Sequence, residues 1–100
     1  EILEIGPIRL DAARYLVVVG GDEVRLTHKE FETLRFLMSN CGMVVSRNQL
    51  LVQVWGYEVA GETRTVDAHI QTLRKKIGEV DQEAASLIET VRGVGYRMKG

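Results

Sequence analysis

The clearest hydrophobic pattern in the chain lies between residues 63 and 78. Four apolar residues recur there at positions i, i+4, i+7 and i+11, namely Val66, Ile70, Leu73 and Ile77. This spacing places them on one face of an α-helix, and such a narrow apolar stripe must face a core. Thr63 is placed to act as the N-cap of this helix, and Gly78 as its C-terminal stop.

Two shorter apolar patterns precede this helix. Each begins with a capping box, in which Ser or Thr is followed three residues later by Glu or Gln. Thr27 and Glu30 form the first box, and Gly42 ends the helix that follows it. The apolar positions of this first helix are Phe31, Leu34, Leu37 and Met38. The spacing predicts that they face the core.

The second capping box, Ser46 with Gln49, opens a short helix that Gly56 terminates. Its inner face consists of Leu50, Leu51, Val54 and Trp55. A polar loop at residues 57–62 separates it from the third helix. Three helices over residues 27–77 therefore follow a helix-turn-helix plan with a long loop.

Short β-branched runs flank the helical region on both sides. Before it lie Ile2–Ile5, Ile8–Leu10, Tyr15–Val19 and Glu23–Leu26. Gly20 and Gly21 are typical of a tight hairpin turn, so residues 1–26 predict a four-stranded antiparallel sheet. Val44 and Val45 read as an extended link, and residues 79–86 as a polar connection. Residues 87–98 predict a C-terminal hairpin that bends at Gly93-Val94-Gly95.

These elements predict one α+β domain over residues 1–100 with the winged helix-turn-helix fold. Of its 100 residues, 45% are hydrophobic, enough to form a core, and the apolar runs are too short to span a membrane. Cys41 is the single cysteine, which excludes an internal disulfide and fits a cytoplasmic location. Because the chain begins at Glu1 without an initiator methionine, we expect it to be part of a longer protein whose missing portion lies upstream.

The charge pattern makes the third helix the candidate functional element. The net charge is −1, which argues against non-specific binding to nucleic acid. Four lysines or arginines lie between Arg64 and Lys76, with Asp67 as the one acid. Small and amide side chains occupy the middle of the polar face, and a rigid helix of this kind suits a DNA major groove. Arg92 at the hairpin tip suits a narrow minor groove.

Four blocks of sequence, in order, resemble the C-terminal effector domain of OmpR/PhoB-type response regulators. They are residues 26–34, residues 44–51 with 54–56, residues 64–70 with 73–76, and residues 90–97. The resemblance implies a winged helix-turn-helix transcription factor that binds double-stranded DNA. It further implies an upstream receiver domain phosphorylated by a sensor kinase, and dimers on direct-repeat DNA. The isolated domain is then expected to be a monomer. Some family members contact RNA polymerase through the loop that corresponds to residues 57–62.

The resemblance also carries over site residues, position by position. Phosphate contacts fall on Trp55, Arg64, Thr65, His69 and Tyr96. The recognition-helix positions that face bases fall on Gln71, Thr72 and Arg74. The wing contacts fall on Thr90 and Arg92. Some members have arginine where this chain has Gln71 and Thr72, so its base preference should differ. A neutral imidazole can donate one hydrogen bond, so we expect His69 to hold phosphate without being protonated.

Two other classes of function compete with this interpretation. A winged-helix module can bind a protein through the same helix and hairpin, and the near-neutral charge fits that alternative. An enzyme would need paired carboxylates, a Cys/His pair or a metal cluster, and the sequence has none at suggestive spacing. We therefore expect no catalytic activity, no metal and no cofactor.

Overall fold

The computed structural model describes residues 1–56 and 62–100. An antiparallel sheet of four strands forms its N-terminal part, in the order β1 (Ile2–Ile5), β2 (Ile8–Asp11), β3 (Leu16–Val19), β4 (Asp22–Glu23). Gly20 and Gly21 both have positive φ, and they form the two-residue turn that pairs Val19 with Asp22. The predicted four-stranded sheet is confirmed, but its fourth strand is Asp22–Glu23 and does not extend to Leu26 as predicted. Tyr15 lies in the preceding turn with φ of 55°, so β3 begins one residue later than predicted.

Both predicted capping boxes are present. Helix α1 spans His28–Ser39, and the Thr27 and Glu30 side chains each accept a hydrogen bond from the other residue's backbone N–H. Ser46 and Gln49 do the same at the start of α2 (Arg47–Leu50), which continues as the π-helical turn η1 (Leu51–Trp55). These local bonds satisfy N–H groups that the first helical turn leaves without partners.

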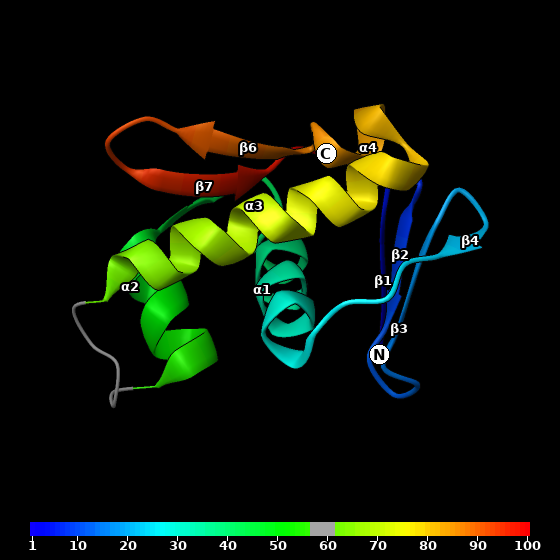
Figure 1. Cartoon of the computed structure of the whole chain (residues 1–100), viewed down its shortest axis with the longest axis horizontal. Helices are drawn as coiled ribbons and strands as arrows, with labels where there is room; N and C mark the ends of the chain where they lie inside the picture. The colour runs from blue at the N-terminus through cyan, green and yellow to red at the C-terminus, as the bar shows by residue number, and fades with distance from the viewer. Residues whose placement is uncertain (57–61) are drawn as a thin grey trace.

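Helix α3 (Thr63–Val80) crosses the molecule in front of α1, with the C-terminal hairpin along one side (Figure 1). Its four stripe residues are fully buried in the core, as predicted. The predicted ends of this helix are wrong. The N-cap residue is Glu62, whose side chain makes no capping bond. Thr63, the predicted N-cap, is the first residue of the helix.

The C-terminal end of α3 lies beyond Gly78, in a region where sequence predicted a connection. Asp81 accepts hydrogen bonds from the N–H groups of Glu83 and Ala84 and so starts the short helix α4 (Gln82–Ala85). A Cβ atom on Gly78 would lie 3.3–3.5 Å from Gln82 and Ala85. The glycine therefore gives α4 room to pack closely on α3.

A second sheet joins the middle of the chain to its end. Its strand order is β5 (Val44–Ser46), β7 (Gly95–Met98), β6 (Ile88–Val91), so the predicted hairpin is confirmed. Val44 and Val45, which were predicted to form an extended link, belong instead to β5 and pair with β7. A Cβ on Gly95 would lie 2.0 Å from the Val45 carbonyl oxygen, so the close approach of β5 and β7 requires glycine there. No helix in the described residues is long and apolar enough to cross a bilayer.

Candidate nucleic-acid interface

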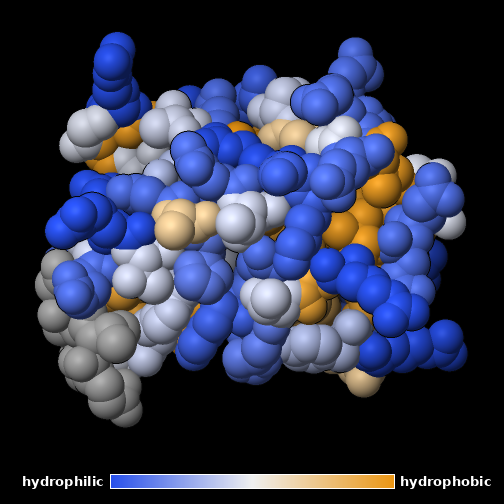
Figure 2. Space-filling model, viewed as in Figure 1, coloured by the Kyte–Doolittle hydropathy of each residue, from blue (hydrophilic) through white to orange (hydrophobic). Residues whose placement is uncertain are grey.

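The outer surface of α3 is a row of four exposed residues opposite the buried stripe. They recur at the same i, i+4, i+7, i+11 spacing and are Arg64, Ala68, Gln71 and Lys75. We call these four residues the outer row. Figure 2 views the molecule from the side on which α3 lies in front, and this face is largely hydrophilic. The outer row therefore offers two cations around an uncharged centre.

One flank of α3 is bonded to the hairpin. Arg74 donates from Nη1 to the Ile88 carbonyl at 3.0 Å and to Thr90 Oγ1 at 3.1 Å. Its guanidinium also lies 5.8 Å from the centre of the Tyr96 ring. Arg74 is half-buried by these contacts. One of its terminal nitrogens is thus occupied within the protein, and the base contact expected of Arg74 stays a prediction.

Asp67, on the same flank, joins three elements. Its carboxylate accepts hydrogen bonds from Arg47 Nε at 3.0 Å, from Arg47 Nη2 at 2.5 Å and from the Tyr96 hydroxyl at 2.6 Å. Burial acts to raise the pKa of Asp67, but the hydrogen bonds from Arg47 and Tyr96 lower it overall. Burial and the bond to Asp67 raise the pKa of Tyr96 to about 12. Because the one hydroxyl proton of Tyr96 points to Asp67, its predicted phosphate contact would have to use the oxygen as an acceptor or rearrange this bond.

A groove of about 620 Å³ separates the start of α3 from the hairpin turn. Thr63 and Asp67 of α3 line it on one side, and Arg92 and Gly93 of the turn line it on the other. Arg92 is exposed at the tip of the hairpin, as predicted, and Gly93 supplies the positive φ of the turn. The groove therefore brings the wing tip next to the N-terminal end of α3.

The opposite flank of α3 carries His69, which packs against η1. Its Nδ1 lies 2.9 Å from the Thr65 carbonyl oxygen, and its ring meets Trp55 edge-on with centroids 4.8 Å apart. A carbonyl only accepts hydrogen bonds, so Nδ1 carries the proton and Nε2 of the neutral ring has none. In this tautomer the neutral ring offers Nε2 only as an acceptor, and the expected phosphate contact of His69 stays a prediction.

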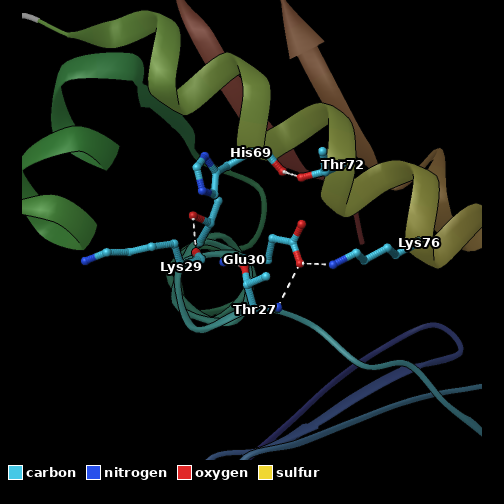
Figure 3. A network of polar contacts seen from close by, with 7 residues as sticks. Thr27, Lys29, Glu30, His69, Thr72 and Lys76 are labelled. Atoms are coloured by element: carbon cyan, nitrogen blue, oxygen red, sulfur yellow. Dashed lines mark hydrogen bonds and ion pairs between the residues drawn. The ribbon is translucent and has the colours of Figure 1, made fainter.

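Two further polar side chains on this flank are bonded internally (Figure 3). Thr72 Oγ1 donates to the His69 carbonyl at 3.1 Å. Lys76 Nζ donates to Glu30 Oε1 at 2.7 Å, across the interface of α3 and α1. Glu30 is buried, which raises its carboxyl pKa, but the bonds from Lys76 and the Thr27 N–H lower that pKa to about 2. Lys76 thus fastens α3 to α1, and because its charge is paired with Glu30 it adds little to the positive charge of the exposed face of α3.

Sequence reasoning missed the roles of Arg47 and Asp67. The available signal was that Asp67 is the one acid between Arg64 and Lys76. Within the described residues, no group of three or more metal-binding side chains is present.

Comparisons with known proteins show the family. The family model described as "Transcriptional regulatory protein, C terminal" matches residues 21–98. The sensory transduction protein RegX3 of Mycobacterium tuberculosis is 46% identical over 99 residues, which cover 99% of this chain and 43% of RegX3. The transcriptional regulatory protein SrrA of Staphylococcus aureus is 41% identical over 99 residues, 41% of its length. The chain thus spans less than half of these relatives.

Solved structures show the same fold. The response regulator DrrB of Thermotoga maritima, described as an OmpR/PhoB homologue, superposes with a TM-score of 0.84 at 38% identity. The match covers 99% of this chain and 44% of DrrB. The DNA-binding domain of RstA from Klebsiella pneumoniae, solved in complex with the RstA box, gives a TM-score of 0.85 at 31% identity. That match covers 99% of this chain and 97% of the RstA domain.

Proposed function

This chain belongs to the C-terminal family of transcriptional regulatory proteins, of the OmpR/PhoB type, and from that premise we propose that it binds specific sequences in double-stranded DNA. It would do so as the effector domain of a two-component response regulator that controls transcription. The observation that carries the proposal is the groove at the start of α3. There Arg92, at the exposed tip of the hairpin, lies beside α3, and neither sheet covers the outer row of that helix.

Each part of this surface fits one part of a DNA duplex. The outer row of α3 enters the major groove, with Arg64 at its N-terminal end set against a phosphate. Arg92 reaches the adjacent minor groove, where the potential is most negative in A·T-rich sequence. Phosphate contacts at Trp55, Thr65, His69 and Tyr96 and a wing contact at Thr90 are supported by the family resemblance.

The family also supports a mechanism for switching. We infer an upstream receiver domain, phosphorylated by a sensor kinase in the cytoplasm, whose dimerisation places two effector domains on a direct repeat. A single domain makes few phosphate contacts and should bind weakly with a strong salt dependence. Tethering two domains raises the effective concentration of the second one, so dimerisation alone can switch binding. The proposed RNA polymerase contact falls mainly on residues 57–61, which lie outside the described residues.

Selection from random duplex DNA, with the single domain and with a forced dimer, tests the function. Enrichment of one sequence, repeated in the dimer, is the expected result. Arg64→Ala should then weaken binding to the enriched site about tenfold, because a phosphate-bound cation is lost. Arg9→Ala is the matched control, since Arg9 is an exposed arginine of the N-terminal sheet, paired with Glu4. If neither form enriches any sequence, DNA binding is refuted and the protein-interaction alternative takes its place.

A further inference from the structure

The centre of the outer row consists of its two uncharged residues, Ala68 and Gln71. Both are exposed, and residues three apart on a helix are neighbours. The Ala68 methyl group and the Gln71 amide therefore form one continuous patch. Arg64 precedes this patch along the row and Lys75 follows it. We call Ala68 and Gln71 the central patch.

Two other polar side chains beside the central patch, those of Thr72 and Arg74, are already bonded inside the protein. The Thr72 hydroxyl donates to the His69 carbonyl, and Arg74 Nη1 donates to β6. The Gln71 side chain is exposed, and it takes part in none of the side-chain hydrogen bonds found within residues 1–56 and 62–100. Its amide can therefore offer both a donor and an acceptor to a ligand. Of the three positions expected to face bases, Gln71 is therefore the one whose side chain is free to bind.

The chemistry of the patch selects among base pairs. In the major groove, a glutamine amide matches the N6 donor and N7 acceptor of adenine, and a methyl group matches the C5-methyl of thymine. Guanine presents two acceptors, which are best met by arginine or lysine, and the central patch has neither. We propose that Gln71 reads an adenine and Ala68 contacts a thymine methyl, so that each half-site has A·T pairs at its centre.

The dimensions of the helix agree with this assignment. Residues 68 and 71 are about 4.5 Å apart along the axis of α3, because each residue rises 1.5 Å. Base pairs are stacked about 3.4 Å apart, so the two side chains fall on the same or neighbouring base pairs. A residue as small as Ala68 also lets the helix approach the bases closely. The inference rests on the proposed function and names the bases that the same surface would read.

Modified bases test each contact separately in a duplex built from the enriched sequence. Replacing the central adenine by 7-deazaadenine removes its N7 acceptor. This change should weaken binding by wild-type protein about 5- to 10-fold and should have no effect on Gln71→Ala. Replacing the central thymine by uracil removes only the methyl group. It should weaken wild-type binding about 2- to 5-fold and leave Ala68→Gly unaffected.

Thr72→Val is the matched control on the same helix, because the Thr72 hydroxyl is bonded internally. This variant should remain as sensitive to 7-deazaadenine as the wild type. The inference is overturned if Gln71→Ala retains that sensitivity, if Thr72→Val loses it, or if the enriched half-site has G·C pairs at its centre. If wild-type protein enriches no sequence, the proposed function itself has failed. That result is distinct from binding with a different base preference.

Discussion

Asp67 of α3 accepts two hydrogen bonds from Arg47 of α2, at 3.0 and 2.5 Å, and a third from the wing through Tyr96. The planar guanidinium of Arg47 matches both carboxylate oxygens, so the pair fixes the orientation of the two helices as well as their separation. Asp67 thus fastens α3 both to α2 and to the wing.

Asp67→Asn should therefore lower both stability and DNA affinity. The substitution keeps the side-chain size but leaves Arg47 without a charged partner. We expect a lower denaturant midpoint with an unchanged m-value, and a several-fold loss of affinity that is equal across DNA sequences. Asp22→Asn, at an exposed acid of β4, is the control. A midpoint equal to that of the wild type would contradict the role of Asp67.

Glu30 should make the domain sensitive to acid. Its pKa is lowered from 4.5 to about 2 in the folded protein, so the folded state favours the charged carboxylate. The resulting stability, roughly 3 kcal/mol, is present above the unfolded pKa and is lost as pH falls from about 4.5 to about 2. Glu30→Gln should destabilise the domain near neutral pH and flatten this acid-dependent loss. Urea unfolding at several pH values measures both effects, and an unchanged acid slope would count against the Glu30–Lys76 pair as its source.

Gly95→Ala should be far more damaging than Gly93→Ala. A methyl group at Gly95 would lie 2.0 Å from the Val45 carbonyl oxygen, so β5 and β7 must separate. We expect a loss of several kcal/mol in the free energy of unfolding. At Gly93 there is no atom within 4 Å of a new Cβ, so only its φ of +74° is unfavourable, at about 1–2 kcal/mol. Equal effects of the two substitutions would show that the close strand approach is not required.

Arg74→Ala should loosen the wing. The variant loses the bonds to the Ile88 carbonyl and to Thr90 that fasten α3 to β6. Amide hydrogens of β6 and β7 should then exchange faster, while those of the N-terminal sheet should not change. Lys75→Ala removes a neighbouring exposed cation and is the control for charge. A loss of preference at one base pair, without faster exchange in the wing, would instead support direct reading by Arg74.

Local signals account for what the sequence predicted well. The partners within each capping box are three residues apart, and the stripe of α3 repeats every three or four residues, so both patterns are visible in a short window. The outer row follows directly, because it lies opposite the stripe.

The features that sequence analysis missed depend on distant partners. Arg47 and Asp67 are 20 residues apart, and Asp67 and Tyr96 are 29 apart. The strand character of β5 likewise depends on β7, which is about 50 residues further along the chain. The internal bonds of Arg74 and the proton position on His69 are tertiary facts of the same kind. The sequence therefore predicted that Asp67, His69 and Arg74 lie on one helix, but it did not show which of their atoms bond to other parts of the protein.

The shared sheet of β5, β7 and β6 has a practical consequence for making hybrid regulators. Strand β5, which leads into α2, also pairs with β7 of the wing. A wing transplanted from a relative would thus be paired with a foreign strand, and its fit would depend on a glycine opposite Ser46, where a Cβ would clash with the Val45 carbonyl oxygen. Exchanging the wing between relatives should therefore succeed when residues 44–46 are transferred together with the hairpin.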